Sequence, residues 1–419
     1  MRDDFTKVVI EVLAKRVGYV CSNPSCEQFT VGPQQEVSGT INIGVAAHIT
    51  AAAPGGPRYD PVLTSDERRS FTNGIWLCQS CAKLVDSDEI RFSVQLLRRW
   101  KDRAELQALE KIHGAVPGGT TVVTLRHVLT GHTNFVWDVA VTPDGRRAVS
   151  VSNDQTVRMW DISSGNLLAT FKGHHAFVCS LSLSQTGNLV ATGAVDGTIK
   201  VWALDSGELR ADWNQGAPDA KVAWGPGENQ LLSGGADGCL QIWNIEDGRC
   251  EQKIQAHSKA ILKVVFLEDG ERLVSVSADK TVRICSAVTG KCVRVFEGHS
   301  GEVNSVAIAS DNHRMISASE DATLRIWDID TGSCEGVLRG HSDIVWRVAI
   351  SRDYRIVASG AKDNTVRLWD LRSNECLQEL PHPDCVAAVA FSPDGSELLV
   401  GCDNARIYVY SVEPTALQS

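Results

Sequence analysis

Aspartate returns at nearly constant intervals through the last two thirds of the chain, and this period constrains the fold more than any other feature. Successive members of the series lie 42, 41, 42, 42, 42 and 40 residues apart. A period of this length is typical of repeat architectures, in which each repeat is one supersecondary unit that buries its apolar faces against its neighbours. We therefore expect seven copies of one unit, marked by Asp154, Asp196, Asp237, Asp279, Asp321, Asp363 and Asp403.

Each repeat has the pattern of short β-strands. Residues 148–152 and 156–160 alternate with period two, and Asn-Asp, Asp-Gly or Ser-Gly pairs punctuate such segments. Alternation indicates strands, while Gly, Asn and Asp supply the backbone conformations that tight turns need. We expect four short strands in each repeat, and hence a mainly β domain.

Tryptophan stands six residues after the aspartate in five of the repeats, and the pair Trp-Asp is intact at residues 160–161, 327–328 and 369–370. A Gly-His pair opens four repeats, at residues 131, 173, 298 and 340. With these motifs the chain resembles the WD-repeat β-propellers, over about residues 121–412. The resemblance implies a seven-bladed β-propeller.

The same resemblance implies a buried tetrad in each blade, in which one His, one Ser or Thr, one Asp and one Trp are hydrogen-bonded. Such groups are costly to bury unless they are paired, so we interpret them as structural rather than catalytic. Four blades match every position, with the sets His132, Ser150, Asp154, Trp160; His174, Thr192, Asp196, Trp202; His299, Ser317, Asp321, Trp327; and His341, Ser359, Asp363, Trp369.

Three blades depart from this pattern. Gln215 replaces the His in blade three, and Cys285 replaces the Trp in blade four. Blade seven keeps His382 and Asp403 but has Leu399 and Val409 at the other two positions. We expect these three blades to be looser, and we expect residues 122–129 to supply the missing fourth strand of the last blade.

Apolar side chains follow the Gly-His turns. In propellers of this type such positions reach the narrower face, where partners commonly dock, although some of these side chains could instead pack between blades. We predict that a protein or peptide binds there, at Phe135, Trp137, Phe177, Ile344 and Trp346.

Charge narrows the choice of partner. Residues 1–116 hold 14 Lys and Arg and 14 Asp and Glu, so the remaining 27 and 37 leave the repeats with a net charge of −10. A propeller that binds duplex DNA would be more basic. Contact with nucleic acid is therefore expected only through the N-terminal region, if at all.

The N-terminal region lacks the 42-residue period and is predicted to form a separate domain. We expect a small α+β domain over residues 1–112, a linker over 113–120, the propeller over 121–412 and a tail over 413–419. Apolar residues at positions 5, 8, 9, 12 and 13 predict an amphipathic first helix, and those at 97, 100, 104 and 108 predict a second one.

Two cysteine pairs in this region have the spacing of a metal site. Cys21 and Cys26 form a C-x4-C motif, and Cys78 and Cys81 form a C-x-x-C motif. Four thiolates make a closed tetrahedral site for structural Zn²⁺, and the alternative is four ordinary buried or redox cysteines. A second set recurs every 42 residues and is interpreted as repeat register rather than a disulfide framework: Cys250, Cys292, Cys334 and Cys376.

The order of motifs over residues 17–101 resembles the zinc-supported HNH endonucleases. His48 matches the histidine that activates water in that family, and Asn73 matches the asparagine that braces the loop. Hydrolysis would need a second ion, Mg²⁺ or Mn²⁺, on ligands of its own. The two matched ligand positions are Ala47 and Ala82, so we interpret the domain as a degenerate relative, leaning towards no enzyme activity.

Two functions remain open. The leading hypothesis is a non-catalytic adaptor, whose propeller binds a protein or peptide and whose zinc module docks a second partner. The alternative is a metal-dependent nuclease effector with the propeller as sensor, an organisation that would resemble bacterial defence proteins. The chain shows no membrane-length apolar run and no leader pattern at its start, so we expect a cytoplasmic protein.

Overall fold

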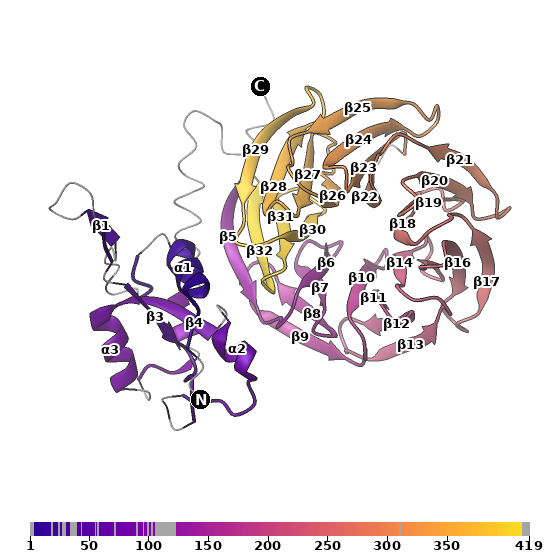
Figure 1. Ribbon diagram of the computed structural model, residues 1–419. Helices are drawn as coiled ribbons and strands as arrows, with labels where there is room; N and C mark the ends of the chain where they lie inside the picture. Colours follow the sequence, from indigo (N-terminus) through magenta and orange to yellow (C-terminus); the bar gives the residue numbers. More distant parts are fainter. Residues whose placement is uncertain are drawn as a thin grey trace. The chain divides into compact units, whose positions relative to one another are not determined.

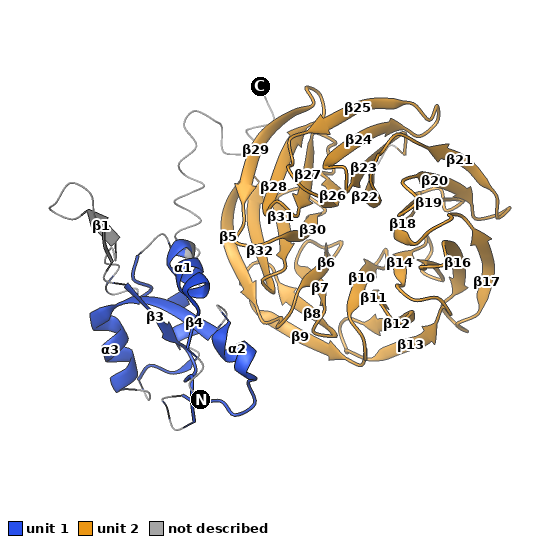
Figure 2. Cartoon of the chain, viewed as in Figure 1, with its two compact units in different colours: residues 1–117 blue, residues 118–419 orange. Residues whose placement is uncertain are grey.

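The chain divides into two compact units, residues 1–117 and 118–419 (Figure 2). The computed structural model describes residues 4–17, 20–23, 26, 31–33, 40–42, 44–54, 56, 58–70, 73–88, 91–94, 96–98, 100–101, 104, 123–309 and 312–412. The expected linker at 113–120 and tail at 413–419 lie outside these ranges. Each unit is described by itself below.

The larger unit is a ring of seven antiparallel four-stranded sheets (Figure 1), which confirms the seven-bladed propeller. Blade one is β6 (Val136–Val141), β7 (Arg147–Ser152), β8 (Thr156–Asp161) and β9 (Leu167–Lys172). Blade two is β10 (Val178–Leu183), β11 (Leu189–Ala194), β12 (Thr198–Ala203) and β13 (Leu209–Asn214). Blade three is β14 (Lys221–Trp224), β15 (Gln230–Gly234), β16 (Cys239–Asn244) and β17 (Cys250–Gln255).

The remaining blades repeat this order. Blade four is β18 (Ile261–Phe266), β19 (Arg272–Ser277), β20 (Val282–Ser286) and β21 (Cys292–Phe296). Blade five is β22 (Val303–Ile308), β23 (Arg314–Ser319), β24 (Thr323–Asp328) and β25 (Cys334–Arg339). Blade six is β26 (Val345–Ile350), β27 (Ile356–Ala361), β28 (Thr365–Asp370) and β29 (Glu375–Pro381). Blade seven is β30 (Val386–Phe391), β31 (Glu397–Cys402), β32 (Arg406–Val412) and β5 (Val123–Thr130).

Closure of the ring joins the two ends of the propeller chain. Strand β5 pairs antiparallel with β32, with Leu129 opposite Ile407 and Val128 opposite Tyr408. The prediction that residues 122–129 complete the last blade is therefore confirmed. The pairing removes the exposed edge that β32 would otherwise present.

The core lies between neighbouring blades. In the layer between blades one and two, Val149 and Phe171 pack with Leu181 and Trp202, and all four side chains are buried. Each sheet is covered on both faces by another sheet, so its central strands carry long buried runs, such as Ile356–Ala361 on β27. Most of the hydrophobic stabilisation thus comes from contacts that exist only when the ring is assembled.

The register of blade seven differs from the sequence prediction by one residue. Gly360 pairs with Val366 in blade six, and the equivalent pair in blade seven is Gly401 with Ile407. Counting from that pair places Val400, Asn404 and Tyr410 at the tetrad positions. The assignment of Leu399, Asp403 and Val409 to those positions was wrong, because the neighbours Asp403 and Asn404 both suit the turn and the sequence alone does not choose between them.

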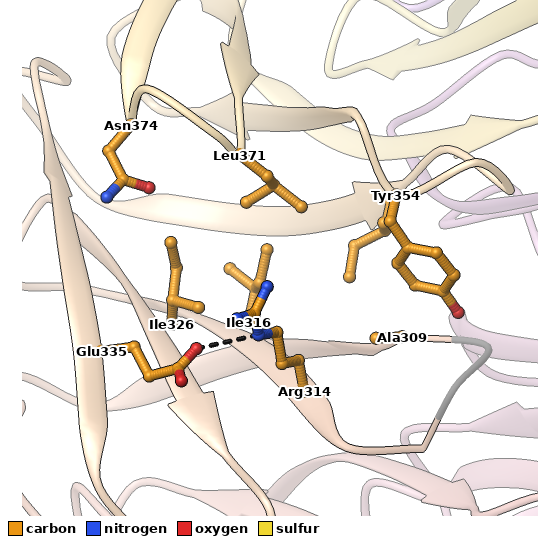
Figure 3. Close-up of a pocket in the computed structure, with 9 residues that line it drawn as sticks. Ala309, Arg314, Ile316, Ile326, Glu335, Tyr354, Leu371 and Asn374 are labelled. Carbon is orange, nitrogen blue, oxygen red and sulfur yellow. Dashed lines mark ion pairs between the residues drawn. The ribbon is translucent and has the colours of Figure 1, made fainter.

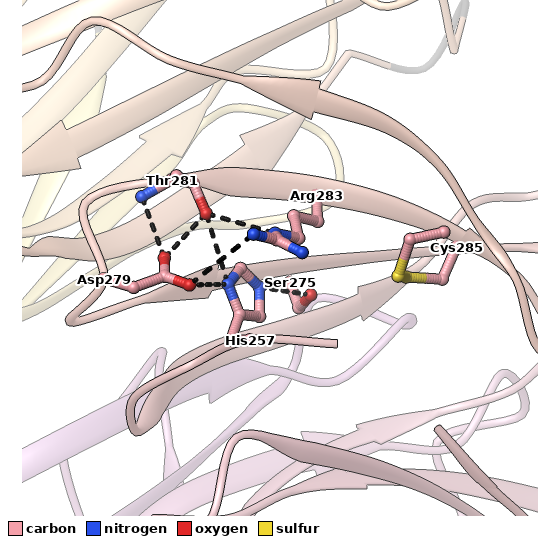
Figure 4. Close-up of a disulfide and its surroundings, with 7 residues drawn as sticks. His257, Ser275, Asp279, Thr281, Arg283 and Cys285 are labelled. Atoms are coloured by element: carbon pink, nitrogen blue, oxygen red, sulfur yellow. Dashed lines mark hydrogen bonds and ion pairs between the residues drawn. A yellow bond between two sulfur atoms is a disulfide. The ribbon is translucent and has the colours of Figure 1, made fainter. Parts of the chain in front are cut away.

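A disulfide joins two adjacent strands of blade four. Cys285 on β20 is bonded to Cys292 on β21, at directly opposed positions of the two strands. Figure 4 shows the bond beside the polar side chains of the same blade. The interpretation of the 42-residue cysteine series as repeat register alone was thus wrong for Cys292. The series still records register, because Cys250, Cys334 and Cys376 oppose tryptophans in their own blades and are free.

The smaller unit is built around a two-stranded sheet of β3 (Gly44–His48) and β4 (Gly74–Cys78). Its other elements are α1 (Lys7–Arg16), β1 (Val31–Pro33), β2 (Thr40–Asn42), α2 (Ser65–Arg69) and α3 (Gln79–Ser87). Helix α1 is capped by Thr6, whose side chain accepts from the Val9 amide, and its residues Leu13 and Ala14 pack on Trp76 of β4. The first predicted helix is therefore confirmed, although Val8 is 71% exposed rather than buried.

The second predicted helix lies partly outside the described residues, including Ala108. Leu97 and Ala104 are buried, as their apolar spacing predicts. Lys101, in the same segment, is only 3% exposed. Long lysine side chains bury their methylene groups readily, so a lysine does not by itself mark the exposed side of a helix.

We predict that replacing Leu129 by alanine destabilises the propeller by about 2–5 kcal/mol, because it removes a fully buried side chain. Leu129 packs with Val136, Trp160 and Ile407 across the closure. The neighbouring change Thr130→Ala is the control, since Thr130 is exposed and should shift the unfolding free energy by less than about 0.5 kcal/mol. Urea unfolding measures both, and equal effects of the two changes would contradict the role of β5.

Candidate functional site

Four cysteines of the smaller unit converge on one point. The Sγ atoms of Cys21, Cys26, Cys78 and Cys81 all lie within 4.8 Å of one another. Such a group of sulfurs can surround a tetrahedral metal ion, whose bonds to sulfur are about 2.3 Å long. The donor set and its compactness therefore fit one divalent cation, with all four coordination positions filled by protein.

Local structure explains why these sulfurs meet. Cys78 ends β4, and Cys81 lies in the first turn of α3, so the C-x-x-C motif folds its two side chains to the same side. Backbone and side-chain N–H groups point at the sulfurs: the Cys78 amide donates to Cys21 Sγ at 3.3 Å, and Asn23 Nδ2 donates to Cys81 Sγ at 3.2 Å. Donors aimed at sulfur favour the thiolate form that a metal requires.

The two residues that match the nuclease pattern lie near each other on the sheet. His48 ends β3 opposite Gly74, and its ring stacks on Phe5 with centroids 3.9 Å apart. Asn73 is buried and bridges to the preceding loop, because its Oδ1 accepts from the Thr50 amide at 3.0 Å and its Nδ2 donates to the Thr50 carbonyl at 3.1 Å. Asn73 thus braces the loop after β3.

No second ion-binding group accompanies His48 within the described parts of the chain. The only cluster there with three or more His, Cys, Asp or Glu ligands is the four-cysteine group. Three carboxylates of this unit have other partners: Asp86 pairs with Arg58 at 3.3 Å, Asp60 accepts from the Val62 amide, and Asp88 accepts from the Arg91 amide. The methyl groups of Ala47 and Ala82 offer no ligand atom.

In the propeller, chains of hydrogen-bonded side chains link the third strand of a blade to its second strand and to the loop before its first strand. In blade one the Trp160 indole donates to Ser150 Oγ at 2.8 Å, and Ser150 lies 2.8 Å from His132 Nε2. His132 Nδ1 is 2.8 Å from Asp154. The ionised Asp154 carboxylate can only accept, so the neutral imidazole of His132 carries its proton on Nδ1 and donates a hydrogen bond to Asp154. Nε2 is then left to accept from the Ser150 hydroxyl. Blades five and six have the same contacts around His299 and His341.

The other blades keep parts of this chain. In blade two His174 Nδ1 lies 3.2 Å from Thr198 Oγ1, and Thr198 donates to Asp196. Blade four keeps His257, Ser275 and Asp279 without a tryptophan (Figure 4). In blade three Gln215 replaces the histidine and donates to the Ala217 carbonyl, while Trp243 still donates to Ser233.

Blade seven uses a tyrosine in place of the serine and the tryptophan together. The Tyr410 hydroxyl lies 2.9 Å from His382 Nε2, and both side chains are buried. Val400 has no hydroxyl, so a phenol at the tryptophan position reaches the imidazole directly. The blade expected to be loose is therefore held by a different buried hydrogen bond.

Electrostatics follow from this burial. Burial alone would raise the pKa of the Asp279 carboxyl, but hydrogen bonds from Thr281 and His257 lower it to about 2. Burial lowers the pKa of His174 to about 4, with a contribution from Lys200. At neutral pH these carboxylates are charged and His174 is neutral, which is the state that the hydrogen-bonded chains need.

Two of the five predicted partner-binding residues contact each other from the blades on either side of blade seven. Trp137 on β6 and Trp346 on β26 form an edge-to-face pair with centroids 6.4 Å apart. Trp137 Nε1 donates to Asn153 Oδ1, which fixes the ring. Phe135 and Phe177 are 41% and 46% exposed, while Ile344 is half-buried. The aromatic pair and the two phenylalanines all lie at the starts of inner strands.

An ion cluster on the innermost strands was missed by the sequence reasoning. Asp138 Oδ2 lies 3.1 Å from Lys263 Nζ and 3.8 Å from Arg347 Nη2. We call these three residues the axial cluster, because they join blades one, four and six across the axis of the ring. These residues occupy equivalent positions of three repeats, but residues of distant blades come into contact only when the ring of blades is closed.

A separate pocket of about 300 Å³ lies between blades five and six (Figure 3). Ile316, Ile326 and Leu371 make an apolar lining, and the Arg314–Glu335 ion pair at 2.9 Å lies among them at the edge. This volume is at the lower end of the range for small-molecule sites. None of the residues predicted from the sequence lines it.

Comparison with known proteins agrees with the repeat structure. The family model for the WD domain, G-beta repeat, matches residues 123–161, 165–203, 220–244, 248–286, 290–328, 332–370 and 374–411. Among the described residues, no helix has the length and apolar character needed to cross a bilayer.

Similar curated proteins align over about one repeat. Cross-pathway control WD-repeat protein 2 of Flammulina velutipes is 48% identical over 40 residues, which are 10% of this chain and 13% of that protein. Striatin-4 of Homo sapiens is 49% identical over 49 residues, 11% of this chain and 6% of that protein. Small ribosomal subunit protein RACK1 of Caenorhabditis elegans is 51% identical over 37 residues, 9% and 11% respectively. The chain thus covers under a sixth of each relative's length.

The depressed pKa of His174 predicts acid sensitivity. An unfolded histidine titrates near 6.5, so between about pH 6.5 and pH 4 the unfolded chain binds a proton that the folded chain excludes. Stability contributed by neutral His174 is therefore complete above pH 6.5 and falls by on the order of 2 kcal/mol towards pH 4.5. Urea unfolding at both pH values should show a smaller decrease in His174→Asn than in the wild type; an equal decrease would contradict this assignment.

Proposed function

The chain belongs to the WD domain, G-beta repeat family, and from this premise we propose that it is a protein-interaction scaffold. Its propeller binds a protein or peptide partner at the binding face, which we define as Phe135, Trp137, Phe177, Ile344 and Trp346. The observation that carries the proposal is the contact between Trp137 and Trp346, two partly exposed indoles on blades that are not neighbours.

The aromatic pair has the properties of a binding hot spot. Tryptophan offers a large apolar area and loses little conformational entropy on binding, and hot spots are enriched in it. The hydrogen bond from Trp137 to Asn153 holds one ring in place before any partner arrives. Phe135 and Phe177 extend the apolar area on exposed loops. A preformed patch of this kind reduces the ordering cost of association.

The relatives support an interaction role only in general terms. One of them is named as a small ribosomal subunit protein, so a repeat similar to these occurs in a component of a large assembly. The alignments cover single repeats, and no partner is transferred from them. Choice of partner would therefore reside in the loops of the binding face, which differ between blades.

For the N-terminal unit we propose a structural zinc module that docks a second partner. Four sulfurs within 4.8 Å of one another favour Zn²⁺ over the oxygen-preferring cations. A bound Zn²⁺ would link the segment after α1 to β4 and α3, and a closed site of this kind contributes to folding rather than to hydrolysis.

The nuclease alternative has one observation in its favour, which is the bridge from Asn73 to Thr50. Against it, His48 stacks on Phe5, and Asp86 is paired with Arg58. A hydrolytic ion needs at least two protein ligands, which Ala47 and Ala82 cannot provide. The alternative therefore stays a hypothesis, and the scaffold is preferred.

We predict that Trp137→Ala and Trp346→Ala each weaken partner binding by at least about tenfold, because each removes about half of the central aromatic contact. Partners captured by the wild-type protein are re-measured against each variant by surface plasmon resonance. The control is Val293→Ala, an exposed apolar residue on the outer strand β21 that lies outside the binding face. Partners that bind both tryptophan variants as tightly as the wild type would show that the binding face is misassigned.

For the metal site we predict one zinc per chain, measured by plasma mass spectrometry on the purified protein. Cys81→Ser should release the metal and unfold the smaller unit, because three thiolates bind zinc less tightly and the site then opens to water. Cys250→Ser is the matched control, since Cys250 is an exposed free cysteine in blade three. Full zinc content in Cys81→Ser would contradict the four-cysteine site.

A further inference from the structure

The inner strands place one equivalent residue of each blade around the axis. Each of these residues pairs with the position that follows the tetrad serine or threonine, or with its equivalent in blade seven. The seven are Asp138, Ser180, Lys221, Lys263, Ser305, Arg347 and Ala388. Three cations and one carboxylate therefore share this layer of a domain whose net charge is −10.

The cations of this layer exceed the carboxylates that balance them. Lys221 is paired with Asp219 at 2.7 Å. Asp138 is left to serve both Lys263 and Arg347, and it also accepts from the Leu181 amide. One carboxylate thus balances two cations in the axial cluster, which carries a net charge of +1.

In the axial cluster, Arg347 is the residue whose guanidinium lacks hydrogen-bond acceptors for some of its donors. It is 9% exposed, its Nη2 donates to the Trp137 carbonyl at 3.3 Å, and at 3.8 Å from Asp138 it is beyond hydrogen-bond distance. Its Nε is buried and meets no acceptor among the described residues. Guanidinium donors buried without acceptors are costly, so they mark a place where an acceptor would be stabilised.

Solvent reaches the same cluster. The Lys263 side chain is 19% exposed, more than Arg347 or Asp138. Burial lowers the pKa of Lys263, and the nearby Asp138 offsets this only in part. A further negative charge beside Lys263 would therefore find a cation whose charge is incompletely compensated.

The aromatic pair lies directly against this layer. Trp137 precedes Asp138 on β6, and Trp346 precedes Arg347 on β26. Arg347 also donates to the Trp137 carbonyl, and Lys263 pairs with Asp138, the residue after Trp137, so both cations lie beside the strand segment that carries Trp137. By contrast, the loops that lead into the inner strands are acidic, with Glu297, Glu302, Asp343 and Asp384 against Lys259 as their one Lys or Arg, in addition to Asp219, which pairs with Lys221.

This charge pattern selects the ligand. An extended polyanion such as a nucleic acid backbone would be repelled by the acidic loops before it reached the axis. A single carboxylate flanked by basic residues is complementary in charge to both regions. The carboxylate would face the cations of the axial cluster, and the basic residues beside it would face the acidic loops. We infer that the binding face recognises a peptide segment of a partner protein in which one Asp or Glu, flanked by Lys or Arg, inserts its carboxylate against Lys263 and Arg347.

This inference rests on the proposed function, since it names the partner chemistry of the binding face. The first test uses the full chain and two labelled pentapeptides, acetyl-Gly-Lys-Glu-Lys-Gly-amide and its Gln-centred counterpart, in fluorescence anisotropy. We expect the Glu peptide to bind at least about tenfold tighter, as for a hydrogen bond to a charged group. Equal binding of the two peptides, or binding of neither, would overturn the inference.

Two variants locate the effect at the axial cluster. Asp138→Asn removes the competing charge and keeps an oxygen for the Leu181 amide, so it should increase the preference for Glu several-fold. Lys263→Gln leaves Asp138 balanced by Arg347 and should abolish the preference, whereas Lys259→Gln on an exposed loop should leave it unchanged. Thermal melts identify any variant that fails to fold. A preference unaltered by both Asp138→Asn and Lys263→Gln in folded protein would place the carboxylate elsewhere and overturn the inference.

Further outcomes distinguish a free inorganic anion from a peptide carboxylate. They also distinguish failure of this inference from failure of the proposed scaffold function. Displacement of the Glu peptide by sodium sulfate, but not by excess unlabelled Glu peptide, would assign the cluster to a free inorganic anion and overturn the peptide inference. If partner binding is lost in Trp137→Ala while the Glu and Gln peptides bind equally, the face is correct and the carboxylate inference alone is wrong. If partner binding survives in Trp137→Ala, the proposed function itself fails.

Discussion

Pairing of the first propeller strand with the last blade is the interaction on which the rest of the structure depends. Strand β5 comes from the start of the repeat region, yet it lies against β32 from its end. Without that pairing blade seven would keep only three of its four strands, and the blades would not be fixed around a common axis. The contacts between non-adjacent blades, Trp137 with Trp346 and Asp138 with Lys263, exist only because the ring is closed.

How much of this could be predicted from the sequence follows from what a repeat encodes. The 42-residue period and the recurring His, Ser, Asp and Trp predicted the blades, the hydrogen-bonded chains and the closing strand, because each of these is local or repeated. Blade seven was misaligned because Asp403 and Asn404 both suit its turn, and only strand pairing identifies Asn404 and Tyr410 as the equivalents. The partner of Cys292 was missed because it lies seven residues away rather than one period away.

The axial cluster could not have been found by that reasoning. Asp138, Lys263 and Arg347 appear in the sequence as ordinary charged residues more than 80 positions apart. Their contact depends on the opposition of blades one, four and six across a closed ring, which sequence spacing does not express. Similarly, C-x4-C and C-x-x-C predicted that four cysteines meet, but not the Asn23 side chain that donates to Cys81.

The two units provide different kinds of site. The propeller has a face whose apolar centre is surrounded by acidic loops, and the smaller unit has a compact group of four sulfurs.

The central claim is that a partner protein binds at the binding face of the propeller. The most direct test is site-specific photo-cross-linking with benzoylphenylalanine at Phe135 on the binding face, with Val293 on the outer strand as the comparison position. The account predicts a defined cross-linked product with a partner protein from position 135 and none from position 293. Cross-links of equal yield from both positions, or from position 293 alone, would contradict it.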